Sequence, residues 1–237
     1  MFKKIFKPTS IGFAAAILTL TSFLSYAIGL IRDRIIAVHF GTSTATDVYN
    51  ASFLIPDSIF NLFIAGALAA AFLPVFSEYL TKDKNEAYKI ANTMINTSIL
   101  LVLGLSILAF IFMNGIIEFS FPQATAAMQK DIVGMTRLML SSSIIFTISN
   151  TIGNILMSYK HFIAYSLSPI LYNAGIILGV IFFQDSLGIY SAALGVIIGG
   201  LIHCLIRLFD LRNTEYKYKM EIHLKHPGFK QILKLML

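Results

Sequence analysis

Six long stretches of the chain carry almost no charged residue, and each is long enough to cross a membrane as a helix. A helix needs about 20 mostly apolar residues to span roughly 30 Å of hydrocarbon. The second stretch starts near Asp47 and carries Asp57 inside it. The predicted spans are residues 9–40, 47–80, 90–117, 133–159, 161–184 and 186–209. The pattern therefore predicts an all-α integral membrane protein with a six-transmembrane-helix bundle over residues 1–210.

Composition agrees with this prediction and excludes other classes of protein. Hydrophobic residues make up 57% and charged residues only 13% of the chain, whereas soluble domains carry about 25% charged residues. The net charge of +6 is interpreted as loops facing anionic lipid, so we expect membrane lipids and no nucleic acid as partners. Cys204 is the single cysteine, so no intrachain disulfide can form. The sequence has no metal motif, cofactor motif or nucleophile–base set, and we expect neither a cofactor nor an enzyme.

The distribution of Lys and Arg predicts the orientation. Fourteen of the 18 basic residues fall on the side of the predicted spans that holds the N-terminus. Since cytoplasmic loops are enriched in Lys and Arg, both termini of this multi-pass protein are predicted to be cytoplasmic. The basic start is interpreted as part of a retained first span rather than a removed signal peptide. Residues 211–237 are predicted to form a basic cytoplasmic linker and the start of a seventh span that is cut at Leu237.

Arg32 and Arg34 depart from this charge rule, because they fall on the predicted outer side. Gly41 is the expected end of the first helix, and Thr44 or Asp47 the expected N-cap of the second. Counting back from Gly41 and forward from Asp47 places Arg32 and Asp57 at one level, about 15 Å below the turn. We expect these two to form an ion pair or to line one cavity, and Arg32, Asp57, Asp47 and Arg34 are the candidate substrate-binding residues. The alternatives are that Arg32 reaches the outer headgroups, Arg34 lies in water, and Asp57 is only a structural partner of Arg32.

Several other positions are interpreted as hinges or packing contacts. Pro56 removes one backbone donor and frees the carbonyl near Ser52, so the second span should bend there, as in the broken helices of transporters. The remaining positions of this kind are Pro74, Gly66, Asn173, Gly199 and Gly200. Asn173 shares a helix face with Pro169 and is expected mainly to pack, with a bond across helices as its functional alternative. His203 is interpreted as a satisfied interior histidine.

An ordered series of short motifs resembles one known family. Gly29-Leu30-Ile31-Arg32-Asp33, Phe40-Gly41 and Ala45-Thr46-Asp47 resemble the opening of the MurJ (MviN) lipid II flippases. The resemblance continues through the stretch from Pro56 to Pro74, then Gly153-Asn154-Ile155-Leu156, Ser168-Pro169, Asn173 and Gly199-Gly200. It covers essentially the whole chain.

The resemblance implies one lobe of a multidrug/oligosaccharidyl-lipid/polysaccharide exporter type fold. It implies that lipid-linked peptidoglycan precursor moves from the inner to the outer leaflet of a bacterial plasma membrane by alternating access. Arg32 matches a family cavity arginine and Asp47 an acidic residue that starts helix two. An arginine fork suits a lipid-linked oligosaccharide diphosphate. A second lobe or second chain is the expected partner, because one lobe encloses no cavity.

The sequence also departs from the family pattern. Tyr26, Phe60, Asn61 and Ala65 stand where the family often carries charged residues. Two alternatives therefore stay open. One is a related exporter of polysaccharide-lipid or drugs, and the other is a non-transporting membrane scaffold or remnant lobe.

Overall fold

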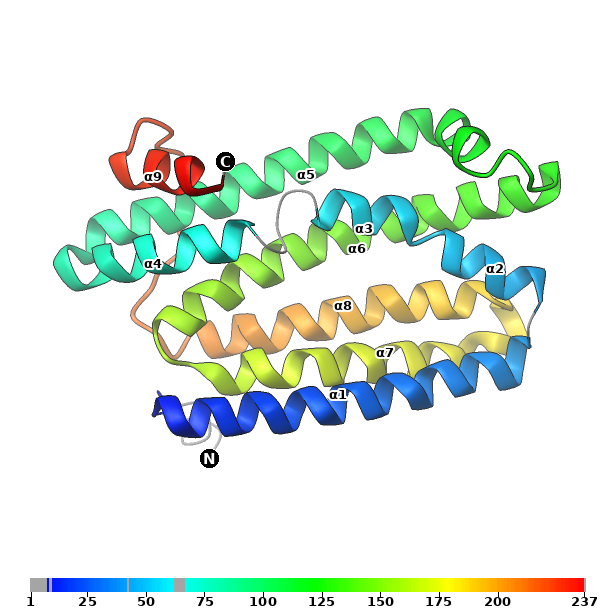
Figure 1. Cartoon of the computed structure of the whole chain (residues 1–237), viewed down its shortest axis with the longest axis horizontal. Coiled ribbons are helices and arrows are strands. Elements are labelled where there is room, and N and C mark those ends of the chain that lie inside the picture. Colours follow the sequence, from blue (N-terminus) through cyan, green and yellow to red (C-terminus); the bar gives the residue numbers. More distant parts are fainter. Residues whose placement is uncertain (1–7, 9, 42, 62–66, 237) are drawn as a thin grey trace.

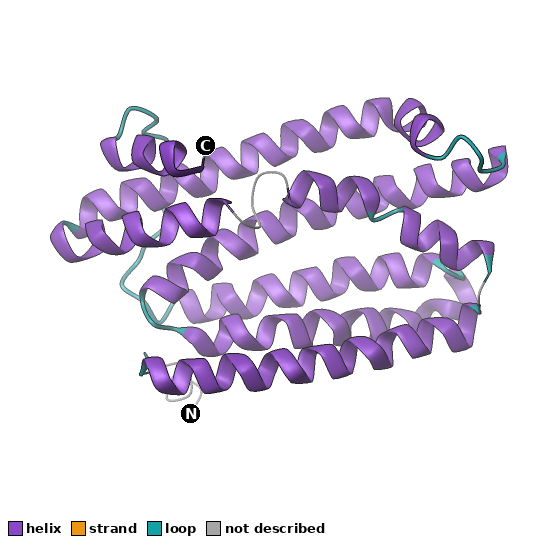
Figure 2. Ribbon diagram, viewed as in Figure 1, coloured by secondary structure: helices purple, strands orange, loops and turns teal. Residues whose placement is uncertain are grey.

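A computed structural model describes residues 8, 10–41, 43–61 and 67–236, and every regular element in this part of the chain is a helix (Figure 2). The helices are α1 (Ile11–Phe40), α2 (Thr44–Ala51), α3 (Leu54–Phe60), α4 (Ala67–Lys82), α5 (Lys84–Ser120), α6 (Ala126–Ser158), α7 (Phe162–Leu187), α8 (Tyr190–Leu211) and α9 (Pro227–Met236). The long helices run side by side and antiparallel, so the chain turns repeatedly between the same two ends (Figure 1). We call the end that holds the α4–α5 and α6–α7 turns the basic end.

In the part of the chain that the structure describes, five helices are long and apolar enough to cross a membrane: Gly12–Phe40, Lys84–Ser120, Ala126–Ser158, Phe162–Leu187 and Tyr190–Leu211. They coincide with five of the six predicted spans, and α5 and α6 extend several residues beyond the predicted limits. The extensions follow from local capping. The Asp83 carboxylate accepts from the backbone N–H groups of Asn85 and Glu86, which starts α5 earlier than its apolar run.

The second predicted span is not one helix. It contains α2, α3 and α4, with a break at Ser52 and Phe53 between α2 and α3. Residues 62–66, between α3 and α4, lie outside the described residues. The break between α2 and α3 lies where Pro56, which has no N–H, was expected to bend the span. Pro74 lies inside α4, which continues past it to Lys82. Gly66 falls outside the described residues.

The connection between α1 and α2 is partly as expected. Gly41 ends α1 with a positive φ of 66° and donates its N–H to the Ala37 carbonyl, a conformation that favours glycine. The prediction of Thr44 or Asp47 as the N-cap was wrong, because both lie inside α2 and the extended residue before it is Ser43. The hydroxyls of Ser43 and Thr46 instead donate to the Phe40 and Gly41 carbonyls at the end of α1.

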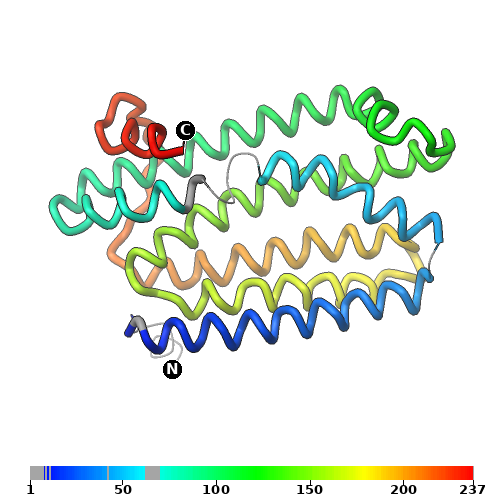
Figure 3. The backbone as a smooth tube through the Cα atoms, in the orientation of Figure 1, coloured from blue at the N-terminus to red at the C-terminus, as the bar shows by residue number. Residues whose placement is uncertain are grey.

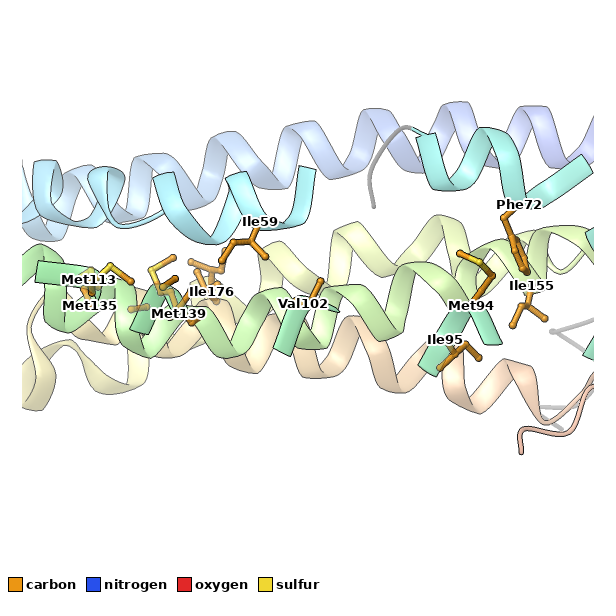
Figure 4. Packing of buried hydrophobic residues seen from close by; sticks show 14 of the residues in the cluster. Ile59, Phe72, Met94, Ile95, Val102, Met113, Met135, Met139, Ile155 and Ile176 are labelled. Carbon is orange, nitrogen blue, oxygen red and sulfur yellow. The ribbon is translucent and has the colours of Figure 1, made fainter. Parts of the chain in front are cut away.

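Packing joins α1 to α7, α7 to α8, α8 to α6, and α6 to α5, with α3 and α4 lying against α5 and α6 (Figure 1). Buried methionine and isoleucine side chains fill the space between these helices (Figure 4). Met113 of α5 lies beside Met135 of α6, and Phe72 of α4 reaches toward Ile155 of α6. These contacts make α6 the central helix of the described bundle.

Glycines bring α7 and α8 unusually close together. A Cβ on Gly175 would lie 2.3 Å from the Gly199 Cα, and a Cβ on Gly179 would lie 2.4 Å from the Gly195 Cα. Real Cβ atoms do not approach other heavy atoms this closely, so the two helices meet backbone to backbone. We call these four residues the glycine seam. Gly200 is not part of it, since its nearest neighbours lie 3.6 Å or more away.

Residues 212–226, here called the linker, leave α8 at the basic end and cross to α5 (Figure 3). Asn92 of α5 accepts hydrogen bonds from the Tyr216 hydroxyl and the Lys219 N–H. The following helix α9 then packs against α4 and α5, with Phe229 and Ile232 buried. The assignment of this region as a linker and the start of a seventh span stays a prediction.

Candidate functional site

Arg32 lies on α1, eight residues before its end, and its side chain is 26% exposed. Its Nη1 donates to the Asn173 Oδ1 at 2.7 Å, and its Nε and Nη2 donate to the Asp33 Oδ1 at 3.0 and 2.8 Å. A guanidinium has five N–H donors, so about two remain for another acceptor. Arg32 is therefore held in place without being fully used.

Asn173 of α7 orients this arginine. Its Nδ2 donates to the Pro169 carbonyl at 3.1 Å and reaches the Ser25 carbonyl and hydroxyl oxygens at 3.4 Å. With its Nδ2 occupied in this way, its Oδ1 faces Arg32 as an acceptor. Asn173 thus joins α7 to α1 by hydrogen bonds, and one of its partners on α1 is Arg32.

Asp57 and Arg32 do not form the direct ion pair that their equal depth suggested. Asp57 is exposed in the first turn of α3, and Asp33 is the carboxylate that pairs with Arg32. The predicted depth gave the height of each side chain but not the direction in which it points. Asp33, the next residue on α1, lies closer to Arg32 than Asp57 does. Both charges nevertheless lie within electrostatic range of the Tyr49 and Tyr172 hydroxyl groups, which are buried.

Asp47 and Arg34 lie apart from this group. Asp47 is exposed in the first turn of α2, and Arg34 is exposed on α1. Two residues along a helix correspond to about 200° of rotation, so Arg34 points away from the face that carries Arg32. Among the described residues neither side chain makes an ion pair, and the structure does not bring them together with Arg32.

A second polar cluster, which the sequence patterns did not predict, is buried between α6, α7 and α8. Arg207 is one of the fourteen basic residues that the charge distribution placed on the cytoplasmic side, yet it is 2% exposed. Its Nε donates to the Ser168 hydroxyl at 3.0 Å, and its Nη1 donates to the Ser149 carbonyl at 3.0 Å and the Asn150 Oδ1 at 3.1 Å. Its guanidinium also lies 4.7 Å from the centre of the Tyr165 ring.

Two histidines extend this cluster. His203 shares a 2.8 Å hydrogen bond with the Ser149 hydroxyl, as an interior histidine with a partner would. His161 lies 2.9 Å from the Oδ1 of Asp210, and both are buried. His203, Arg207 and Asp210 follow one another at spacings of four and three, which places them on one face of a helix. This spacing of three polar residues within an apolar helix could have predicted the cluster from the sequence.

Neither group of side chains forms a metal centre. Within the described part of the chain, three His, Cys, Asp or Glu side chains do not come together in a geometry that could hold a metal ion. Arg207 is buried and its Nε and Nη1 donate within the protein, whereas Arg32 is partly exposed. A partly exposed guanidinium suits recognition of an anion.

Comparison with known proteins gives a consistent assignment. Residues 36–237 match the family model described as lipid II flippase MurJ; Arg32 precedes the matched range. A probable lipid II flippase MurJ of Borreliella burgdorferi is 27% identical over 216 residues, covering 90% of this chain and 42% of that protein. The lipid II flippase MurJ of Thermosipho africanus is 31% identical over 211 residues, covering 89% and 42%.

Solved structures show the same relationship. A lipid II flippase MurJ in an inward closed conformation superposes with a TM-score of 0.76 at 25% identity, covering 93% of this chain and 47% of that one. A MATE protein in a bent conformation superposes with a TM-score of 0.69 at 16% identity, covering 94% and 51%, which indicates a shared fold.

The relatives also indicate how much of a family member this chain represents and to which class of protein it belongs. The chain spans less than half the length of the relatives described above. The family is one of flippases, which transport lipid, and not of catalytic enzymes. Its apolar helices make this chain a multi-pass membrane protein, and the match over residues 36–237 shows that it belongs to the MurJ lipid II flippase family.

Proposed function

We propose that this chain takes part in moving lipid II from the inner to the outer leaflet of a bacterial plasma membrane, with Arg32 binding the diphosphate. One observation carries the assignment of Arg32. Its guanidinium is oriented by Asn173, balanced by one carboxylate and has N–H groups that no described residue accepts from. Phosphate oxygens accept from such a fork in a charge-assisted, bidentate manner.

Asp33 and Asp57 would tune the binding of the anion. A diphosphate approaching Arg32 competes with the Asp33 carboxylate for the Nε and Nη2 donors, so binding would be exchangeable rather than permanent. Asp57 and Arg32 both lie within electrostatic range of the Tyr172 hydroxyl, and repulsion between the Asp57 carboxylate and the diphosphate would favour release. Asp47, at the start of α2, would act in gating rather than in binding.

The proposed mechanism is alternating access with a partner lobe. The segment formed by α2, α3 and α4 would act as the second of six spans, and its break before Pro56 provides a place to bend. Both termini would lie in the cytoplasm, in keeping with the concentration of lysines at the basic end. Because the chain covers under half of its relatives, the second lobe would come from further sequence or from another chain.

The test is the outer-leaflet accessibility of labelled lipid-linked cell-wall precursor in cells depleted of the complete natural protein. Rescue is attempted with the wild-type protein, with Arg32→Ala, and with Arg34→Ala as the matched control on the same helix. We expect the wild type and Arg34→Ala to restore accessibility and Arg32→Ala to fail.

Two results would change the proposal. Full rescue by Arg32→Ala at equal protein levels would remove this residue from the binding site. Unchanged accessibility on depletion would reject lipid II as the substrate, and would favour a related exporter of polysaccharide-lipid or drugs, or a scaffold.

A further inference from the structure

A groove of about 860 Å³ lies along α8 near the basic end. Apolar side chains line most of it, among them Leu205, Ile206 and Phe209 of α8 and Leu171 of α7. Its polar lining comes from Arg212 and Tyr216, where α8 gives way to the linker. The volume lies in the range of sites that hold a small ligand, and the groove combines a long apolar wall with a cation at one end.

The acidic and basic side chains beside the groove differ in their contacts. Both carboxylates of the linker are used internally, since Glu215 pairs with Lys84 and Glu221 accepts from the Asn92 side chain at 2.7 Å. The cations are exposed and make no ion pair with another described residue; they are Arg212, Lys217, Lys219 and Lys225, followed by Lys230 and Lys234 of α9. The exposed surface of the linker and α9 is therefore strongly positive.

Apolar side chains stand between these cations. Met220 is 92% exposed, and Tyr218, Ile222 and Leu224 are also exposed. Successive side chains of an extended segment point to opposite faces, so the linker carries lysines on one face and apolar side chains on the other. Water solvates the lysines but not the apolar groups, whereas the interface of an anionic bilayer satisfies both.

From these observations we propose that the groove binds one anionic phospholipid of the leaflet at the basic end. An acyl chain lies along the apolar wall formed by Leu205, Ile206 and Phe209, and the phosphate is bound by Arg212. The linker lysines hold neighbouring anionic headgroups. This site is separate from Arg32 and does not depend on the proposed transport of lipid II.

The test uses the complete natural protein in nanodiscs of phosphatidylcholine that contain photoactivatable phosphatidylglycerol, with the reactive group on the acyl chain. After irradiation, labelled peptides are mapped. We expect label on the second half of α8, competition by unlabelled phosphatidylglycerol, and no competition by millimolar inorganic phosphate. Arg212→Gln should lower labelling about fivefold, as for loss of one interfacial cation.

Matched variants separate the groove from its surroundings. Leu205→Trp fills the groove and should abolish labelling there, while Leu201→Trp, one turn earlier on α8 and outside the groove, should not. Lys230→Gln removes an exposed cation of α9 and should leave labelling of α8 within about twofold.

Three outcomes would overturn the proposal. The first is equal labelling by photoactivatable phosphatidylcholine, and the second is unchanged labelling in Arg212→Gln, which is exposed and should not disturb folding. The third is an equal loss in Arg212→Gln and Lys230→Gln, which would mean diffuse attraction to the surface without a defined site.

Discussion

Adding one methyl group to the glycine seam should separate α7 from α8, whereas the same change one residue away should not. A Cβ on Gly199 would lie 2.3 Å from the Tyr172 carbonyl oxygen, so the helices must part by about 1 Å to reach a normal contact near 3.5 Å. Overpacking of this kind costs about 1–3 kcal/mol. A Cβ on Gly200 would meet Ile145 at 3.6 Å, an ordinary contact.

Both substitutions gain the same helix propensity, up to about 1 kcal/mol, so comparing Gly199→Ala with Gly200→Ala isolates the effect of the clash. The free energies of unfolding should differ by about 1–3 kcal/mol, or very roughly 2–12 °C in Tm. Tm values are compared in one detergent at one heating rate, because unfolding can be irreversible. Equal Tm values would refute the backbone-to-backbone contact between α7 and α8.

Three further predictions follow from bonds described above. Asn173→Ala should lower precursor translocation more than Arg34→Ala does, because Arg32 loses its orienting acceptor; equal translocation rates would contradict this. Asn92→Leu should speed tryptic cleavage after the linker lysines at least severalfold, whereas Asn85→Ala, at an exposed position on the same helix, should not. A cleavage rate equal to that of the wild type in Asn92→Leu would show that other contacts hold the linker. The Asn92 side chain, and then His223, lower the pKa of Glu221 from its ordinary 4.5. The contribution of the Glu221 carboxylate to attachment of the linker should therefore be complete above pH 4.5 and weaken as the pH falls below it. A nitroxide label on the linker should report this change, and Glu221→Gln should largely remove it; an identical pH profile in Glu221→Gln would refute the role of this carboxyl group.

The sequence predicted what depends on position along the membrane normal. Helix lengths follow from the thickness of the bilayer, the end of α1 follows from Gly41, and the break after α2 follows from Pro56. It did not predict what depends on rotation about a helix axis. The choice of Asp33 over Asp57 as the partner of Arg32 and the burial of Arg207 both required knowing which face each helix presents.

The linker illustrates a similar limit. Its composition predicted a basic cytoplasmic segment, but polar residues such as Asn92 and Asn96 of α5 gave no indication that they bind it. Asn96 donates to the Glu221 carbonyl and accepts from the Tyr218 hydroxyl. Contacts between residues about 125 positions apart in sequence are set by how the helices are arranged, which local patterns do not encode.

The attachment of the linker to α5 has a mechanical consequence. A segment that joins two helices usually provides slack, so that each can tilt independently. Here the linker leaves α8 but is bonded to α5, and α9 is packed on α4. A force applied to α9 would therefore load the α4–α5 hairpin first and reach α8 only after those bonds had broken.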